Sequence, residues 1–351
     1  MARIIASVLA RSRDQVVGLA QKAAMLGADW LELRLDVWPP QDDLPPVVAA
    51  TRLPVLVACR TPEDGGKFRG TLTARRELLS RALAAGAVGI DLEQWETWSP
   101  PAGRTGLKLR VRSFHSFTGV PAGLDRIRDE LAAEGTVTKL VVTAHDLADA
   151  APVVELLRHT DQRQKPTVAF AMGRTAWPTR VLAAAMGAPF VYGSVEDGEE
   201  TAPGQPSIAL LAGLYRTAQL GPDTRLFGLL GNPALHSLGP WLHNRAFRRL
   251  GRDAVYLPLE TSRPEAVLAM LPRERLGGLS VTAPHKERMV AACARTTDAA
   301  AAIGVVNTLF VDGDGRLCGD NTDVLGVEEA LRRAGAGDGG GAAAAVLGSG
   351  G

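Results

Sequence analysis

The sequence predicts an α/β protein with two folded parts, a (β/α)8 TIM barrel followed by a smaller α/β domain. Three observations support this fold class. The chain has 351 residues, which is more than one hydrophobic core usually serves. Short apolar runs alternate with helical patterns up to about residue 215. The alternation starts again after a Gly-Pro turn at Gly221 and Pro222.

Eight apolar runs in the first part are candidate strands. They span residues 3–9, 30–36, 54–59, 87–93, 107–117, 138–144, 166–172 and 189–195. A helix is expected between the first two runs, over residues 13–27. It places four side chains on one face, Val16, Leu19, Ala20 and Ala23, and can end at Gly27. Residues 71–86 have the same pattern. Eight strand and helix units in roughly 200 residues fit a (β/α)8 barrel, with its active site at the C-terminal ends of the strands.

The second part begins with an apolar run at residues 224–231. A helix is expected over residues 239–251, because Pro240 suits a first helical turn and Gly251 suits a helix end. Residues 335–342 are rich in glycine and predict a flexible linker. The chain then ends in "AAAVLGSGG", which predicts a strand that runs into a glycine turn. We therefore expect domains at residues 1–220 and 221–337, with residues 338–351 as a linker and the start of a third domain.

Composition and charge favour small-molecule chemistry. The chain has 39 Lys+Arg and 38 Asp+Glu, without a basic block or acidic tail, so neither nucleic acid nor a membrane is an expected partner. Its three cysteines, Cys59, Cys293 and Cys318, are far apart and form no CxxC pair. No apolar stretch approaches the ~18 residues of a spanning helix, and the N-terminus becomes charged too soon for a signal peptide. A cytoplasmic protein is expected.

Charged side chains interrupt the second candidate strand. Glu32, Arg34 and Asp36 share one face of a strand over residues 30–36, because side chains alternate between faces. A central barrel strand has no face in water, so its charges need partners or a polar opening. The pattern indicates either a functional site or a structural ion-pair network.

Lys139 and His115 lie in neighbouring candidate strands. In a buried strand, the stem of Lys139 either reaches toward solvent or the amine loses its proton. Desolvation and nearby cations lower the pKa of such a lysine and expose the neutral amine that attacks a ketone to form a Schiff base. His115 could shuttle a proton beside it, although a lone histidine is more often structural. The two positions reinforce each other.

These residues belong to a set of motifs that resembles type I 3-dehydroquinate dehydratases in order and spacing. The motifs are "ELRLD", "CRTPEDGG", "DLE", "SFHSF", the strand lysine, "MGRTAWPTR" and "TAPGQ". The resemblance implies that Lys139 forms an imine with the ketone of 3-dehydroquinate. It implies that His115 removes the adjacent proton and assists the departure of the hydroxyl, without a cofactor. The substrate contacts that it implies are Glu32, Arg34, Arg60, Arg180 and Gln205.

Three positions depart from this family pattern. Asp64 stands where glutamate is usual, Ala176 replaces a loop glycine, and Thr201 replaces a serine. Asp64 is one methylene shorter in its contact to the histidine, which could reduce the rate without changing the reaction. Thr201 keeps its hydroxyl. We expect Asp64 and Thr201 in the substrate site.

Four later motifs resemble, in register, the substrate-binding domain of shikimate dehydrogenases. They are "GNPALHSLGPWLHN", "GGLSVTAPHKE", "GVVNTL" and "GDNTDVLG". The resemblance implies a catalytic pair, Lys286 and Asp323, that relays the proton accompanying hydride transfer. It also implies hydrogen bonds to 3-dehydroshikimate or shikimate from Ser237, Thr282, Asn307 and Asn321.

Other positions in this region depart from the family pattern. Gly239 stands where a second serine is usual, Ser280 where asparagine is usual, and Val305 where alanine is usual. Only the first strand of a truncated Rossmann domain follows. Its cofactor, NADP, would contact Gly348, Gly350 and Gly351, which cannot hold a nicotinamide alone.

The whole pattern predicts a bifunctional shikimate-pathway enzyme with a working dehydratase and an inactive, truncated dehydrogenase. The alternatives are a non-catalytic sensor of dehydroquinate or shikimate and a different Schiff-base barrel such as an aldolase. No metal site is expected, since His236 and His243 lie around a glycine-proline turn and suit a motif and a helix better than ligands. A homodimer is compatible with the sequence.

Overall fold

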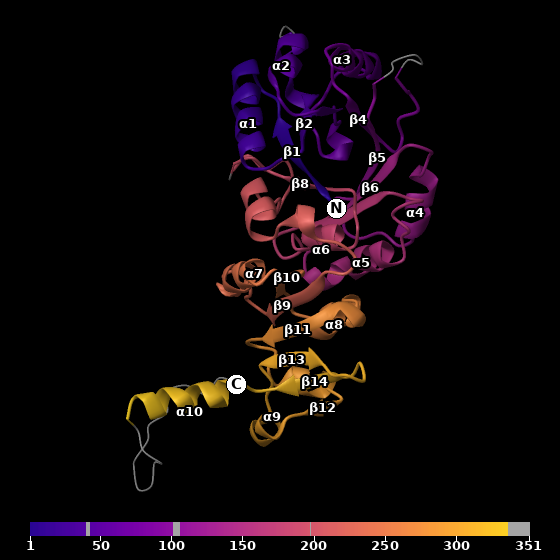
Figure 1. The fold of residues 1–351 in the computed structure, drawn as a ribbon. Coiled ribbons are helices and arrows are strands. Elements are labelled where there is room, and N and C mark those ends of the chain that lie inside the picture. The colour runs from indigo at the N-terminus through magenta and orange to yellow at the C-terminus, as the bar shows by residue number, and fades with distance from the viewer. Residues whose placement is uncertain (40–42, 101–105, 197, 336–351) are drawn as a thin grey trace. The chain divides into compact units, whose positions relative to one another are not determined.

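The computed structural model describes residues 1–39, 43–100, 106–196 and 198–335. The chain divides into two compact units, Met1–Thr224 and Arg225–Gly351. Each unit has its own sheet (Figure 1). The expected linker after Gly335, the strand that should follow it and the three C-terminal glycines lie outside the described residues.

Eight parallel strands form the sheet of the first unit. They are β1 (Arg3–Leu9), β2 (Trp30–Arg34), β3 (Val55–Ala58), β4 (Gly89–Glu93), β5 (Leu109–His115), β6 (Val137–Thr143), β7 (Thr167–Met172) and β8 (Phe190–Gly193). Their order is β7-β6-β5-β4-β3-β2-β1-β8, so strands adjacent in sequence are mostly adjacent in space. Because β1 also pairs with β8, the sheet curls into a nearly closed barrel. The predicted TIM-like fold is confirmed.

Helices follow most of these strands. They are α1 (Arg13–Met25), α2 (Leu44–Ala50), α3 (Leu72–Ala84), α4 (Leu124–Leu131), α5 (Ala151–Arg158) and α6 (Thr179–Ala185). The predicted apolar face of α1 is buried, and Ser12 caps its first turn by accepting a hydrogen bond from the backbone of Gln15. Thr71 caps α3 in the same way. None of the helices in these described ranges or in the second unit is long and apolar enough to cross a membrane.

The second predicted strand is shorter than its sequence pattern indicates. It ends at Arg34, and residues Leu35–Val37 form a 3-10 turn (η1). In this turn the Asp36 carboxylate accepts hydrogen bonds from Arg34 Nε at 2.9 Å and from the backbone N–H of Lys67 at 3.1 Å. Asp36 therefore acts as a local ion-pair partner of Arg34, and the expectation that it continues a strand face is wrong.

The second unit is an α/β domain with a mixed six-stranded sheet, in the order β10-β9-β11-β13-β14-β12. The strands are β9 (Arg225–Gly231), β10 (Ala254–Glu260), β11 (Leu276–Val281), β12 (Arg295–Thr296), β13 (Thr308–Val311) and β14 (Leu317–Asp320). Its helices are α7 (Gly239–Arg249), α8 (Pro264–Met270), α9 (Asp298–Ile303) and α10 (Asp323–Arg333). The predicted helix over residues 239–251 thus ends two residues early, before Gly251, which has φ +61°.

Shorter helical segments complete both units. They are η2 (Pro62–Asp64), η3 (Leu147–Ala150), the π-helix η4 (Ala209–Leu214), η5 (Thr217–Gln219), η6 (Arg273–Arg275) and η7 (Arg288–Ala292). The segment η2 matters most for the site, because it carries Asp64 from the end of β3 toward the barrel opening.

Candidate active site

A pocket with a cavity volume of about 100 Å³ opens at the carboxyl ends of the barrel strands. Arg34, His115 and Met172, the last residues of β2, β5 and β7, all line it. The structure brings together every barrel residue that the sequence nominates, Glu32, Arg34, Arg60, Asp64, His115, Lys139, Arg180, Thr201 and Gln205. The position of the pocket is the one at which barrels of this fold place catalytic groups.

Lys139 is only 4% exposed. Its Nζ lies 2.6 Å from Asp91 Oδ2, 3.9 Å from Glu32 Oε1 and 3.4 Å from the Tyr192 hydroxyl. Burial and the nearby Arg60 cation lower the pKa of Lys139, although the Asp91 carboxylate opposes them. A larger fraction of the amine is therefore neutral and nucleophilic than in an exposed lysine.

His115 faces the same pocket from the neighbouring strand. In the β5–β6 register Ser113 pairs with Lys139 and His115 pairs with Val141, so the histidine lies two residues beyond the lysine's partner, on the same face. Its Nδ1 lies 3.3 Å from Arg60 Nη1. Burial and the cations of Arg60 and Lys139 hold the pKa of His115 well below its ordinary value. The imidazole is therefore neutral near pH 7 and can accept a proton.

Asp91 and Glu93 of β4 are site residues that sequence reasoning left without a role. Arg60 Nη2 lies 2.6 Å from Asp91, and Arg60 Nη1 lies 3.5 Å from Glu93. Burial by itself would lower the pKa of Arg60, but these two carboxylates outweigh it and raise that pKa. The sequence carried a signal for both residues, because Asp91 and Glu93 alternate along a buried strand in the same way as the charged residues of 30–36.

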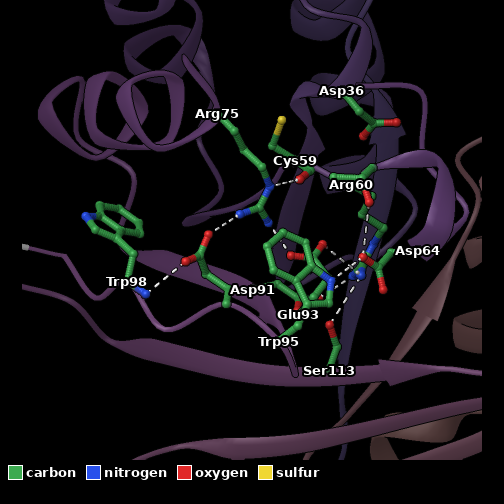
Figure 2. Close-up of polar contacts among 12 residues, drawn as sticks. Asp36, Cys59, Arg60, Asp64, Arg75, Asp91, Glu93, Trp95, Trp98 and Ser113 are labelled. Carbon is green, nitrogen blue, oxygen red and sulfur yellow. Dashed lines mark hydrogen bonds and ion pairs between the residues drawn. The ribbon is translucent and has the colours of Figure 1, made fainter. Parts of the chain in front are cut away.

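A second layer of charge lies behind this cluster. Arg75 of α3 is fully buried and contacts the Glu93 carboxylate and the carbonyl of Cys59, the latter at 2.6 Å (Figure 2). It thereby holds Glu93 through Oε2, whereas Arg60 faces Oε1. Arg75 also lies 2.8 Å from Glu96 Oε2. Burial raises the pKa of the Cys59 thiol to about 12, so this cysteine is not a nucleophile near neutral pH.

Arg180 differs from the other buried arginines of the barrel. It is 1% exposed, packs its guanidinium 3.8 Å from the centre of the Phe170 ring, and lines the pocket. Within the described residues its Nε and Nη2 atoms have no hydrogen-bond partner. Burial lowers the pKa of Arg180 to about 9. A buried guanidinium with unused donors at a pocket suits the carboxylate of a ligand, which it can bind in bidentate fashion.

A hydroxyl chain crosses the rim of the pocket. Thr201 donates to Ser7 at 2.9 Å, and Ser7 donates to the Glu32 carboxylate. The side-chain carbonyl of Gln205 accepts from the backbone N–H of Thr201 at 2.8 Å. These contacts orient Glu32, Thr201 and Gln205 before any ligand arrives.

Asp64 does not make the contact that we expected. Its Oδ2 accepts a hydrogen bond from Trp95 Nε1 at 2.7 Å (Figure 2) and another from Thr61 Oγ1 at 3.3 Å. In the part of the chain that the structure describes, no hydrogen bond or ion pair joins Asp64 to His115. The expected Asp64–histidine contact is therefore wrong for this structure, although both residues line one pocket.

The second unit brings four nominated residues together. Lys286 Nζ lies 2.6 Å from Asp323 Oδ2, and this hydrogen bond lowers the pKa of Asp323. Asn321 Oδ1 accepts from the backbone N–H of Asp323 at 3.0 Å. Asn307 exchanges hydrogen bonds with Thr322. The pair is thus set between two asparagines at the start of α10.

The other nominated residues of this unit lie at strand and helix ends. Ser237 precedes α7, and its Oγ accepts from the backbone N–H of Gly239 at 3.0 Å. Thr282 follows β11, and its backbone N–H donates to the carbonyl of Leu230 near the end of β9. A Cβ at Gly239 would lie 3.1 Å from Ser237 Oγ and 3.2 Å from the Tyr256 ring, so a second serine would be tightly packed there. Gly348, Gly350 and Gly351 lie outside the described residues.

Comparison with known proteins gives the same division of the chain. A family model for type I 3-dehydroquinase matches residues 4–222, and one for the shikimate dehydrogenase substrate binding domain matches residues 229–309. The bifunctional 3-dehydroquinate dehydratase/shikimate dehydrogenase of Arabidopsis thaliana is 34% identical over 348 residues, which are 95% of this chain and 57% of the plant protein. This chain therefore spans less than two thirds of that relative's length.

Two further relatives correspond to one unit each. A shikimate dehydrogenase (NADP(+)) of Pelobacter propionicus is 45% identical over 109 residues, 30% of this chain and 39% of that protein. The crystal structure of 3-dehydroquinate dehydratase from Geobacillus kaustophilus is 20% identical, with a TM-score of 0.50 over 60% of this chain and 91% of that one, and supports the fold alone. Neither the sensor nor the aldolase alternative has support among these relatives. The chain belongs to the type I 3-dehydroquinase family.

Proposed function

We propose that the first unit dehydrates 3-dehydroquinate to 3-dehydroshikimate through a Schiff base on Lys139. The observation that carries this proposal is one pocket that holds a buried amine of lowered pKa, a neutral imidazole and an arginine with unused donors. These three groups are a nucleophile, a base and a carboxylate anchor. The reaction needs all three.

The proposed steps balance as follows. The neutral Lys139 amine adds to the substrate ketone, and loss of one water leaves a protonated imine. His115 takes a proton from the adjacent carbon, and the electron pair of that C–H bond moves into the iminium to give an enamine. The enamine expels the neighbouring hydroxyl, which leaves as water with the proton held by His115. Hydrolysis of the imine then releases the enone and restores Lys139.

Substrate binding divides among the remaining pocket residues. Arg180 would hold the carboxylate, because its donors are free to form a bidentate pair. Glu32, Thr201 and Gln205 would bind hydroxyls at the rim. Arg34 and Arg60 are already paired, with Asp36 and with Asp91 and Glu93, so we assign them a largely electrostatic part. Arg60 lowers the pKa of the amine and of the imidazole, and Arg34 lowers the pKa of the imidazole.

The test is intact mass after incubation with 3-dehydroquinate and borohydride, alongside ultraviolet detection of the enone without borohydride. Wild type should gain one reduced adduct and produce enone. Lys139→Ala should do neither, whereas Lys165→Ala, which removes an exposed lysine of the same unit, should behave as wild type. Substrate binding without adduct or enone would replace the dehydratase with a sensor, and a retro-aldol fragment would indicate an aldolase.

For the second unit we propose binding of 3-dehydroshikimate or shikimate, with Lys286 and Asp323 as the proton relay of a dehydrogenase half. The hydrogen-bonded pair, partly exposed beside Asn307 and Asn321, suits a proton that moves to or from a secondary alcohol. NADP(H) would supply or accept the hydride when bound. Calorimetric titration of the full chain with shikimate tests the binding. Asn307→Ala and Ser237→Ala should weaken it, and Asp314→Asn, in an exposed turn, should not.

The finer assignments belong to the same proposal. We place the two activities in residues 1–220 and 221–337, with residues 338–351 as the start of the NADP-binding part. The cytoplasmic location and the homodimer remain predictions. They rest on the composition of the chain and on its resemblance to shikimate-pathway enzymes.

A further inference from the structure

Alternate strands of the barrel each send one buried side chain to the same level of its interior. These side chains are Glu32 of β2, Asp91 of β4, Lys139 of β6 and Tyr192 of β8, all at most 4% exposed. The Lys139 Nζ lies within 3.9 Å of an oxygen of each of the other three. In barrels of this fold the side chains of alternate strands form one layer, and such a layer is usually apolar. Tyr192 is the uncharged member of this one, and the proposed steps do not use it.

Tyr192 presents both its hydroxyl and its ring to the amine. The hydroxyl oxygen accepts a hydrogen bond from Lys139 Nζ at 3.4 Å, and the centre of the ring lies 4.4 Å from the same nitrogen. The amine therefore lies nearer the hydroxyl than the centre of the ring. Phe190 packs edge-on against this ring with 5.6 Å between centroids, and Phe170 packs on it with 6.4 Å. The packing fixes the position of the hydroxyl before any ligand binds.

This hydroxyl differs from the other oxygens around the amine because it carries no charge. Burial and the carboxylates of Glu32 and Asp91 raise the pKa of Tyr192 well above its ordinary value, so the phenol keeps its proton near neutral pH. The Asp91 carboxylate accepts an N–H of Lys139 but also raises the pKa of the amine, which favours the ammonium form that is not nucleophilic. A neutral phenol oxygen accepts an N–H with much less of that effect.

The direction of the lone pair decides whether the amine can react. A neutral amine has two N–H groups and one lone pair, and only the lone pair attacks a ketone. Asp91 Oδ2 takes one N–H at 2.6 Å, and the Tyr192 oxygen takes the other. The lone pair is left for the side of the pocket that Glu32 lines, where Glu32 Oε1 lies 3.9 Å from Nζ and has no hydrogen-bond partner within the described residues. Without the Tyr192 oxygen, rotation about the Cε–Nζ bond would turn the lone pair away.

We propose that Tyr192 is a positioning residue whose hydroxyl oxygen holds one N–H of Lys139, so that the lone pair of the amine points at the substrate ketone. The inference rests on the proposed dehydratase function, which makes Lys139 the nucleophile. The contact of 3.4 Å is long for a hydrogen bond, and we expect it to shorten once the ketone lies beside the amine. The phenol proton is not transferred in any step.

The experiment follows formation of the Lys139 adduct with 3-dehydroquinate over time and across a pH series, with borohydride quenching and intact mass of the full chain. Tyr192→Phe keeps the ring and its packing and removes only the oxygen. Its plateau rate of adduct formation should fall about five- to ten-fold, while the pH midpoint of the profile stays that of wild type. Tyr215→Phe removes the hydroxyl of another buried tyrosine, which packs on Trp177, and should behave as wild type.

The same variant tests whether Tyr192 acts through the amine or through the substrate. Calorimetric binding of 3-dehydroquinate on the Lys139→Ala background should be equal with and without Tyr192→Phe. Weaker binding there would make Tyr192 a substrate contact and overturn the inference. A shifted pH midpoint would overturn it as well, since the phenol would then act on the protonation of the amine.

The rates in Tyr192→Phe and wild type separate this inference from the proposed function. An adduct that forms equally fast in both would leave the dehydratase in place and reduce Tyr192 to a packing residue. A faster rate in the variant would mean that the hydroxyl donates to the lone pair and masks it, which is the opposite of the proposed role. Absence of the adduct in wild type would remove the dehydratase, and the inference with it.

Discussion

The amine of Lys139 and the carboxylate of Asp91 lie 2.6 Å apart in the barrel interior, although 48 residues separate them in sequence. The same Asp91 oxygen lies 2.6 Å from Arg60 Nη2, so one carboxylate compensates two buried cations. Asp91 therefore sets both the stability of the cluster and the protonation of the proposed nucleophile.

Removal of this carboxylate should lower stability and the pKa of Lys139 together. Asp91 raises the pKa of Lys139, so Asp91→Asn should lower it further and move the alkaline rise of borohydride trapping to lower pH. It should also cost about 3–5 kcal/mol in urea unfolding, because two cations stay buried without their partner. Asp129→Asn, at an exposed ion pair, is the control and should change neither. An unchanged trapping profile in Asp91→Asn would contradict this account of the amine.

Two fully buried arginines should respond in opposite ways to the same substitution. Arg180→Met removes a cation without a counter-ion, so the free energy of unfolding should stay level or rise. Binding of 3-dehydroquinate, measured by calorimetry on the Lys139→Ala background, should weaken at least about 30-fold. Arg75→Met removes a guanidinium bound to Glu93 and Glu96 and should cost about 3–5 kcal/mol. Equal destabilisation by both changes would show that Arg180 has a structural partner after all.

His115 should make the protein less stable in mild acid. Its folded-state pKa is lowered, mainly by burial, so the unfolded chain binds the proton more readily. Stability is therefore full above the ordinary histidine pKa and falls as the pH drops below about 6.5. His115→Gln should lose less stability than wild type between pH 7.5 and 5.5 in urea unfolding. His145→Gln, at an exposed site, should match wild type, and an identical loss in all three proteins would exclude the linkage.

The Lys286–Asp323 pair should contribute little to folding. The two side chains are 20% and 55% exposed, so solvent screens their attraction and the pair should be worth less than about 1 kcal/mol. Lys286→Met should leave the thermal transition of the second unit nearly in place. It should also return the pKa of Asp323 toward its ordinary value, because the hydrogen bond that lowers it is lost. Calorimetric unfolding and a carboxyl NMR titration measure the two effects, and a large loss of stability would make the pair structural.

The sequence alone was enough to predict the repeating architecture of the barrel. Burial on both faces of a parallel strand leaves a nearly continuous apolar run, and a covered helix leaves a stripe with a period of 3.6 residues. For that reason the existence and order of the eight strands were predicted, although several strands are shorter than predicted, and so was the buried face of α1. The same rule singled out Lys139 and the charged residues of β2, since a charged side chain in such a run has no solvent-exposed face of the strand on which to lie. Their catalytic roles remain predictions.

Only the tertiary structure decided which charges meet. Asp91 reaches Lys139 across β5, and Trp95 reaches Asp64 through a loop 31 residues away, because closure of the sheet brings the strand ends together. The end of β2 at Arg34 is likewise a tertiary matter, since Asp36 turns out of the strand to bind Arg34 and the Lys67 backbone. A sequence pattern specifies which face a side chain occupies. The partner on that face, and with it the pKa and the orientation, depends on distances that exist only once the barrel has closed.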